Sequence, residues 1–153
     1  MPNLITVAGG PRVNDFPVET MRLGSVDYGL AGYCEKTFPK LVEALDQDKV
    51  SESDLKKIPN LYYFVEDDLR STPPSTKPVI LDDLPYPKRE LVNLRDYYTA
   101  VDEEQMTTLY TSRGCPFYCT FCASHTIHGR KLRLHSLEHI FTEIDKFLES
   151  YIR

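Results

Sequence analysis

The chain has 153 residues, of which 41% are hydrophobic and 27% are charged, and its formal net charge is −5. This balance is typical of a globular domain and excludes a fibrous or wholly disordered chain. The acidic charge argues against a nucleic-acid partner. No apolar run is long enough to span a membrane, and the N-terminus lacks the features of a secretory signal. Composition therefore predicts a cytoplasmic protein without a membrane span.

Two β-prone segments lie in the first fifty residues. The apolar run at residues 4–8 predicts a buried strand, and residues 26–33 predict a second one. Gly9 and Gly10 follow the first run directly and predict a tight turn. Because a helical segment separates the two strands, we expect them to be parallel, with helices packed on the sheet.

Two helices are predicted in the same region. Pro17 suits the first turn of a short helix that ends near Gly24. A longer helix follows the second strand, because four apolar residues recur there at the spacing of one helical face. These residues are Phe38, Leu41, Val42 and Leu45.

The middle of the chain has a different pattern. Residues 51–59 are polar and allow one helical turn. Residues 61–65 and 69–72 are predicted to form a hairpin around an acidic turn. The Pro-rich segment at residues 72–78 reads as a linker. We therefore expect a domain boundary between residues 72 and 100.

The last fifty residues predict a strand, a cysteine-containing loop and a helix. Residues 107–111 are rich in β-branched and aromatic side chains and predict the strand. A basic stretch at residues 130–133 follows the loop, and we interpret it as a solvated strand. Ser136 suits the N-cap of the final helix. The predicted apolar face of that helix consists of Leu137, Ile140, Phe141, Ile144, Leu148 and Tyr151.

The four cysteines are unevenly distributed. Cys34 stands apart and is most simply a small buried hydrophobe. Cys115, Cys119 and Cys122 lie within eight positions. In a reducing compartment, clustered cysteines are more often metal ligands or redox groups than disulfides.

The CxxxCxxC spacing alone leaves three interpretations open. Three cysteines can hold an iron–sulfur cubane and leave one iron open to a ligand. Alternatively, His125 or His128 completes a zinc site with the three thiolates. The third interpretation is a set of unliganded buried thiols.

The residues around the cysteines favour the first interpretation. Residues 112–122 read Ser-Arg-Gly-Cys-Pro-Phe-Tyr-Cys-Thr-Phe-Cys, which closely resembles the signature of the radical S-adenosylmethionine superfamily. The aromatic Phe121 before the last cysteine fits the pattern, and the preceding Ser-Arg-Gly is typical of the branch that carries a cobalamin-binding domain.

This resemblance implies a chemistry and its cofactors. Cys115, Cys119 and Cys122 would hold a [4Fe–4S] cluster, and S-adenosylmethionine would bind the open iron with Phe121 near its adenine. An electron from an external donor of flavodoxin or ferredoxin type would cleave S-adenosylmethionine, giving a deoxyadenosyl radical that attacks a small-molecule substrate. The cobalamin-using branch consists largely of methyltransferases.

The resemblance also implies a fold and its limits. Residues 1–50 resemble the C-terminal part of a Rossmann-like cobalamin-binding domain, in which Gly9 and Gly10 would lie against cobalamin. Residues 51–100 resemble the hairpin and linker, and residues 101–153 resemble the first βα unit of a partial TIM-type barrel. The expected fold class is therefore α/β with parallel sheets.

Only 38 residues follow Cys115, and eight precede Gly9. Both domains of the resemblance need more chain than this. We therefore expect an internal fragment across a domain junction, marginal in stability and inactive by itself. A small zinc-binding module and a catalytically inactive remnant are the alternative hypotheses.

Overall fold

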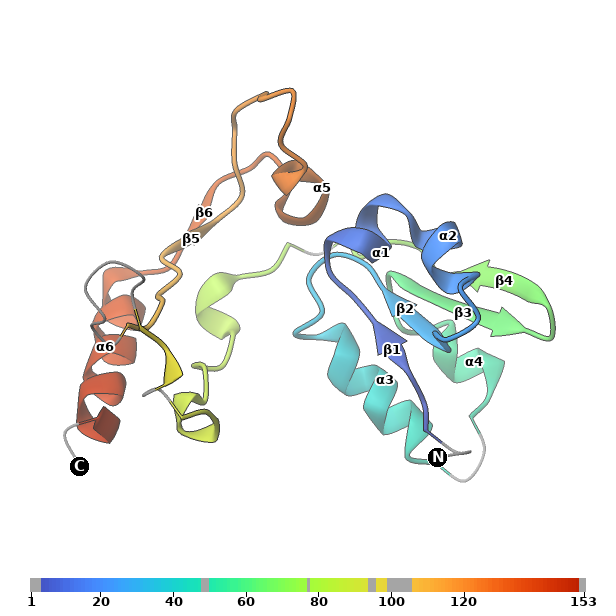
Figure 1. Ribbon diagram of the computed structural model, residues 1–153, viewed down its shortest axis with the longest axis horizontal. Coiled ribbons are helices and arrows are strands. Elements are labelled where there is room, and N and C mark those ends of the chain that lie inside the picture. The colour runs from blue at the N-terminus through green and yellow to red at the C-terminus, as the bar shows by residue number, and fades with distance from the viewer. Residues whose placement is uncertain (1–3, 48–49, 77, 94–95, 99–105, 152–153) are drawn as a thin grey trace. The chain divides into compact units, whose positions relative to one another are not determined.

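The computed structural model divides the chain into two units (Figure 1). The first, here the sheet unit, comprises residues 1–79 and 114–131, and the second, here the α6 unit, comprises residues 80–113 and 132–153. The structure describes residues 4–47, 50–76, 78–93, 96–98 and 106–151.

The sheet unit contains a four-stranded sheet in the order β1-β2-β3-β4. Strand β1 (Val7–Ala8) pairs in parallel with β2 (Tyr28–Leu30), as the sequence predicts. The expected burial of residues 4–8 is wrong, because the strand comprises two residues and Leu4, Ile5 and Val7 are exposed. The predicted hairpin is also confirmed, with β3 (Leu61–Val65) antiparallel to both β2 and β4 (Asp68–Ser71). The sheet is therefore mixed, because the hairpin adds two antiparallel strands to the parallel pair.

Four helices flank this sheet (Figure 1). The two predicted ones are α2 (Pro17–Met21) and α3 (Thr37–Leu45). The possible turn after residue 50 is α4 (Glu52–Leu55), where the Ser51 hydroxyl caps the helix by accepting the Asp54 N–H. The sequence did not predict α1 (Pro11–Asp15). It starts directly after Gly10, whose φ of 79° turns the chain from strand into helix without the steric cost of a side chain.

The main core lies between the sheet and helices α3 and α4. It consists of Leu30, Leu41, Ala44, Leu55, Ile58, Leu61 and Tyr63, all buried. The predicted apolar face of α3 is wrong in part, because Phe38 and Val42 are 46% and 48% exposed. The buried face runs instead through Thr37, Leu41 and Ala44. Phe38 and Val42 lie outside this buried face.

Helices α1 and α2 pack on the other face of the sheet. Their side chains Val13 and Met21 are fully buried. The contact requires a glycine at position 29, since a Cβ there would lie 2.8 Å from Met21 Sδ and 3.3 Å from Tyr62 Cβ. Side chains alternate between the two faces of a strand, so Gly29 meets α1 and α2 while Leu30 enters the main core.

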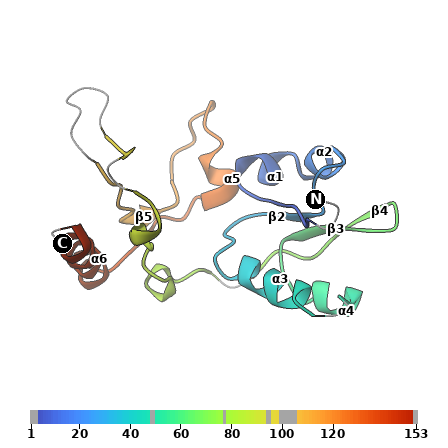
Figure 2. The same cartoon turned by 60° about the horizontal axis from the view of Figure 1, so that its bottom comes forward.

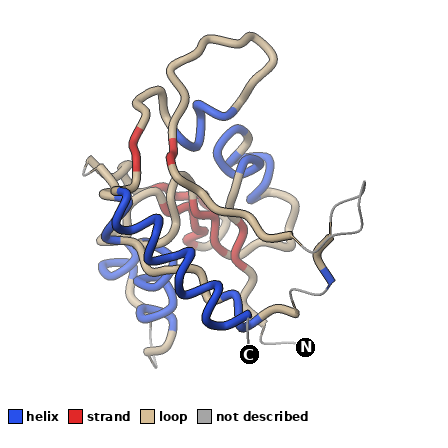
Figure 3. The backbone as a smooth tube through the Cα atoms, turned by 90° about the vertical axis from the view of Figure 1, so that its left-hand side faces the viewer, coloured by secondary structure: helices blue, strands red, loops and turns tan. Residues whose placement is uncertain are grey.

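The α6 unit has little regular structure besides its last helix (Figure 3). It contains the short 3₁₀ helices η1 (Leu81–Asp83) and η2 (Arg89–Leu91). Strand β5 (Ser112–Arg113) pairs antiparallel with β6 (Arg133–Leu134), and α6 (Leu137–Tyr151) follows. Ser136 is the predicted cap, since its Oγ accepts the His139 N–H at 3.1 Å.

The predicted strand at residues 107–111 is wrong. Residues 107–111 form no ladder, and the regular strand begins at Ser112. Arg89 donates to the Thr107 hydroxyl at 3.1 Å and to the Thr108 carbonyl at 2.7 Å. The Thr111 carbonyl accepts the N–H of residue 135 at 2.9 Å. The polar groups of residues 107–111 are therefore bound by Arg89 and by the backbone of residue 135, and not by a neighbouring strand.

The predicted apolar face of α6 is also wrong. Leu137, Phe141 and Leu148 are 71%, 60% and 44% exposed, and Ile140 and Ile144 are half-buried. The side chain of Tyr151 lies outside the described part of the chain. The buried residues of α6 are His139 and Glu143. Glu143 pairs with Arg89 at 2.6 Å, whereas His139 stacks on Tyr86 and lies 3.8 Å from Asp82. The covered side of the helix is therefore the one that carries these two polar residues.

The expected domain limits at residues 50 and 100, and the assignment of residues 101–153 to the start of a barrel, remain predictions. In the part of the chain that the structure describes, no helix is both long enough and apolar enough to cross a bilayer.

Candidate functional site

The three clustered cysteines lie on one long loop of the sheet unit, which we call the cysteine loop (residues 114–131). The loop leaves β5 and returns to β6, with the short helix α5 (Ser124–His128) in its second half. All three thiols are free of disulfides. Cys115 and Cys122 are half-buried, and Cys119 is exposed. The loop therefore carries three free thiols within eight positions of sequence.

Backbone hydrogen bonds hold the cysteines in place. The Cys115 N–H donates to the Gly129 carbonyl at 3.2 Å and closes the base of the loop. The Cys122 N–H donates to the Cys119 carbonyl at 3.2 Å, which folds these two cysteines into one turn. The Ser124 N–H lies 3.5 Å from Cys122 Sγ, within the range of a hydrogen bond to sulfur. Such a donor stabilises negative charge on the sulfur.

Arg130 braces the first half of the loop. Its Nη1 donates to the Phe117 carbonyl at 3.0 Å, and its guanidinium lies 3.9 Å from the centre of the Tyr118 ring. Both contacts lie between Cys115 and Cys119. The basic stretch thus differs from the predicted solvated strand, because β6 begins only at Arg133 and Arg130 holds the loop.

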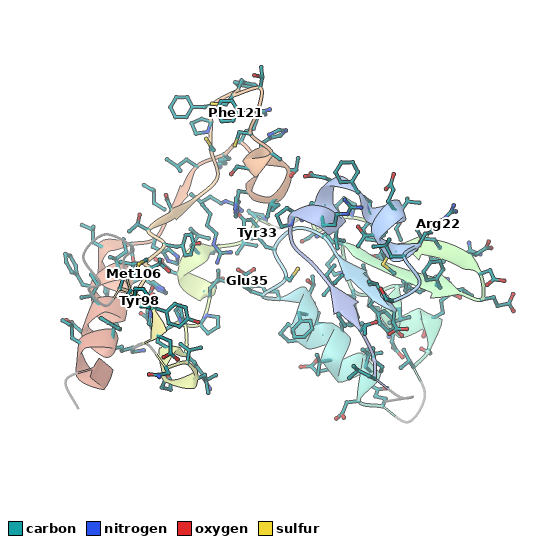
Figure 4. All side chains as sticks on the ribbon, in the orientation of Figure 1. Arg22, Tyr33, Glu35, Tyr98, Met106 and Phe121 are labelled. Atoms are coloured by element: carbon teal, nitrogen blue, oxygen red, sulfur yellow. The ribbon has the colours of Figure 1, made fainter. Side chains whose placement is uncertain are left out.

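The side chain of Phe121 points into open space near the tip of the loop (Figure 4). It is 90% exposed, and the neighbouring Phe117 and Tyr118 are 72% and 77% exposed. The exposed ring of Phe121 is accessible to a ligand, and its role beside adenine remains a prediction.

The two loop histidines contact other groups. His125 Nδ1 lies 3.1 Å from the Cys122 carbonyl, and His128 Nδ1 lies 3.0 Å from the Tyr33 hydroxyl. Helix α5, which carries both, packs against α1 (Figure 2). Among the described residues, no three His, Cys, Asp or Glu ligand atoms of the cysteine loop lie within 4.8 Å of one another. The loop is therefore not closed around a single metal ion.

Gly9 and Gly10 lie at the junction of β1 and α1. Gly10 has a positive φ of 79°, and a Cβ placed there would meet nothing within 4 Å. A Cβ at Gly9 would make ordinary contacts of 3.6 Å and 3.8 Å with Leu30 and Cys34. The turn is thus open to solvent at Gly10. Its predicted contact with cobalamin remains a prediction.

Cys34, expected as a small buried hydrophobe, is only partly buried. It is half-buried against the main core, with Sγ 3.7 Å from the Leu30 carbonyl and 3.5 Å from the Gly32 carbonyl. Burial raises the pKa of its thiol, and the charge of Glu35 adds to this effect. Cys34 therefore stays protonated at neutral pH and is separate from the three loop cysteines.

The structure brings together a second group of possible metal ligands that the sequence patterns did not predict. Asp82, His135 and His139 of the α6 unit bring one ligand atom each within 4.8 Å of the other two. The two histidines are four positions apart, and this spacing predicts that they lie on the same side of the chain where a helix begins. Asp82 gives no such signal, because it lies more than fifty positions earlier in the sequence.

The chain is similar over most of its length to larger proteins. It is 37% identical over 145 residues to an uncharacterized methyltransferase of Pyrococcus horikoshii, an alignment that covers 93% of this chain and 30% of that protein. It is 26% identical over 174 residues to the cytidylyl-2-hydroxyethylphosphonate methyltransferase of Streptomyces wedmorensis, covering 98% and 33% of the two chains. Its homologues include methyltransferases. The chain spans about a third of the length of these relatives, and no known family profile matches it.

A solved structure shares the fold. It is the radical S-adenosylmethionine methyltransferase TsrM of Kitasatospora setae with cobalamin and a [4Fe-4S] cluster bound. The TM-score is 0.64 at 18% identity, over 98% of this chain and 30% of that one. At this identity the likeness establishes the mixed α/β arrangement alone.

Proposed function

We propose that this chain carries the cluster-binding segment of a radical S-adenosylmethionine methyltransferase. The observation that carries the proposal is the set of free thiols Cys115, Cys119 and Cys122, held on one braced loop in the spacing CxxxCxxC. Homology to methyltransferases and the fold shared with a cluster-binding, cobalamin-binding enzyme support it. The proposed substrate is a small molecule, and the proposed electron donor is a flavodoxin or ferredoxin.

The loop fits a cluster better than a single ion. The ligand atoms around one tetrahedral zinc ion lie roughly 3.4 Å apart for two nitrogens and roughly 3.8 Å apart for two thiolate sulfurs. The cysteine loop has no three ligand atoms within 4.8 Å of one another. A four-iron cluster spreads its cysteine sulfurs further, because each sulfur binds a different iron.

A [4Fe–4S] cluster on three cysteines supplies an open iron and one electron for cleaving the sulfonium of S-adenosylmethionine. The residues of the chain provide binding and orientation. The hydrogen bond from Cys115 to Gly129 fixes the first ligand, and the Cys119–Cys122 turn fixes the other two. Arg130 keeps residues 116–118 in one conformation through Phe117 and Tyr118. Phe121 offers an exposed ring for packing against adenine.

Anaerobic reconstitution tests the cluster. With iron and sulfide the chain is expected to become brown, and Cys119→Ala is expected to lose most of the visible absorbance. Cys34→Ala is the matched control and is expected to keep it, because Cys34 packs against the core. A colourless chain that retains one zinc and loses it when His125 and His128 are both replaced would instead identify the zinc-binding module.

We also propose the turn at Gly9 and Gly10 as a contact for cobalamin. A glycine turn lets a ligand approach the backbone, and the space around Gly10 is open. Gly10→Ala is expected to weaken cobalamin binding, measured by the change in its visible spectrum. Gly24→Ala is the matched control, because Gly24 also has a positive φ and open surroundings. Equal weakening in both variants would show a folding effect and contradict the contact.

A further inference from the structure

The start of α6 brings together an unusual set of polar side chains. Asp82 lies in η1, His135 follows β6, and His139 lies in the first turn of α6. His135 Nδ1 is 3.0 Å from Asp82 Oδ1, and His139 Nδ1 is 3.8 Å from the same oxygen. All three residues belong to the α6 unit and none to the cysteine loop. Two imidazoles thus converge on one carboxylate oxygen.

Hydrogen bonding accounts for only part of this cluster. Asp82 accepts the Ser136 N–H at 3.1 Å through Oδ1 and 3.2 Å through Oδ2, so it caps α6. His135 is within hydrogen-bond distance of the same carboxylate. His139 is not, since 3.8 Å is too long for a hydrogen bond. A helix cap therefore explains the positions of Asp82 and His135 and leaves His139 unexplained.

The ring of His139 is enclosed on both sides. It stacks on Tyr86 with ring centres 4.4 Å apart and on His135 at the same separation. Its side chain is 9% exposed, so the ring is nine-tenths buried. The polar contact that the structure gives this ring is its 3.8 Å approach to Asp82. Stacking holds this ring beside the carboxylate, and the 3.8 Å between Nδ1 and Oδ1 is a separation at which both atoms can bind one ion.

We propose that Asp82, His135 and His139 form a binding site for a divalent metal ion of the zinc type. Ligand atoms on one tetrahedral zinc lie roughly 3.4 Å apart. The observed separations of 3.0 Å and 3.8 Å bracket this value, and all three atoms lie within 4.8 Å of one another. Imidazole and carboxylate together suit zinc, and the set is neither all-oxygen, as calcium and magnesium prefer, nor sulfur-based.

The three residues would supply three of the four ligands of a tetrahedral ion. Glu143 lies one turn along α6 from His139, but its carboxylate binds Arg89 Nη2 at 2.6 Å and is not available as a fourth ligand. His135 and His139 also line a cavity of about 640 Å³, which gives an ion a route into the site. The bound ion would join η1 to the start of α6 inside one unit.

The decisive experiment measures metal binding without the cysteine loop's thiols. Cys115, Cys119 and Cys122 are all replaced by serine in the full chain, and Co²⁺ is titrated as the probe. We expect one equivalent of bound Co²⁺, with d–d absorption and no thiolate charge-transfer band, displaced by Zn²⁺. No saturable binding in this variant would overturn the proposal. The outcome is independent of the proposed cluster, because that cluster cannot form without the cysteines.

Two ligand variants and one control complete the test. In the same background, His139→Gln is expected to weaken Co²⁺ binding by roughly 100-fold, the upper range for groups that support a metal. Asp82→Asn is also expected to weaken Co²⁺ binding. Its amide oxygen can still accept the Ser136 N–H, so this weakening would not come from loss of the helix cap. His125→Gln, in the cysteine loop, is expected to bind as the parent does. Unchanged affinity in either ligand variant would overturn the site.

A stability measurement separates a ligand from a structural residue. Saturating Zn²⁺ is expected to raise the thermal midpoint of the serine variant, since an ion that binds only the folded chain stabilises it. The same Zn²⁺ concentration is expected to raise the midpoint of the His139→Gln variant much less, because its affinity is lower. An equal rise in both chains would show that His139 is not a ligand.

Discussion

Helices α3 and α6 are both amphipathic, yet they are held by opposite kinds of contact. Helix α3 buries Leu41 and Ala44 against the sheet. Helix α6 buries His139 and Glu143 and leaves Leu137 and Phe141 largely exposed. The comparison teaches that an apolar stripe predicts a helix well but does not by itself determine which side is covered.

The same contrast extends to the two units. The sheet unit has seven buried or nearly buried apolar side chains in one continuous core. The α6 unit depends on polar contacts, among them Arg89 with Glu143 at 2.6 Å and Asp82 with the start of α6. We therefore expect the two units to respond to different substitutions.

The largest effect is expected from breaking the ion pair of the α6 unit. Glu143→Ala leaves the Arg89 guanidinium, 14% exposed, without its carboxylate. Loss of one partner of a buried pair costs about 3–5 kcal/mol. Amide hydrogen exchange along α6 is expected to lose its protection, while the sheet keeps its own. Glu149→Ala, an exposed carboxylate on the same helix, is the control; equal protection in the two variants would contradict the account.

In the sheet unit, the matching test shortens a buried apolar side chain of the core. Leu61 is fully buried, and Leu61→Ala is expected to cost about 2–5 kcal/mol through lost burial and the remaining cavity. Phe38→Ala, at a site 46% exposed, is expected to cost much less. Urea unfolding followed by the sheet's circular dichroism measures both. A larger effect at Phe38 than at Leu61 would show that the apolar face predicted from sequence is the one that packs.

The smallest expected difference concerns thiol reactivity. Burial raises the pKa of Cys34, so at any pH near neutrality a smaller fraction of it is thiolate. Cys119 is exposed. In the metal-free chain, iodoacetamide is expected to modify Cys119 faster than Cys34, and the rate at Cys34 is expected to rise as the pH increases toward its raised pKa. Peptide mass spectrometry over time measures both rates, and faster labelling of Cys34 would contradict its burial.

Sequence patterns predicted the elements whose cause is local. Proline placement located α2, and the β-rich runs at residues 61–65 and 69–72 located the hairpin. Helix α1 was missed because it depends on the positive φ of Gly10. The strand at residues 107–111 was wrong because its polar groups bind Arg89, a partner nearly twenty positions away.

The candidate sites also divide into features with a local sequence pattern and features that depend on contacts between distant residues. The three clustered cysteines could be recognised as candidate ligands because all three lie within eight positions. The bracing of the loop by Arg130 and the cluster of Asp82 with His135 and His139 depend on contacts across longer separations. No single-sequence pattern encodes such pairs, since only the folded backbone brings them together.

The most direct test of the central claim is Mössbauer spectroscopy of the anaerobically reconstituted chain. We expect a four-iron cluster in which one iron differs from the other three, because Cys115, Cys119 and Cys122 would bind only three of the irons. Cys122→Ala is expected to lose this spectrum, and Cys34→Ala is expected to retain it. A chain that holds zinc and no iron, or an iron spectrum unchanged by Cys122→Ala, would contradict cluster binding by the three loop cysteines.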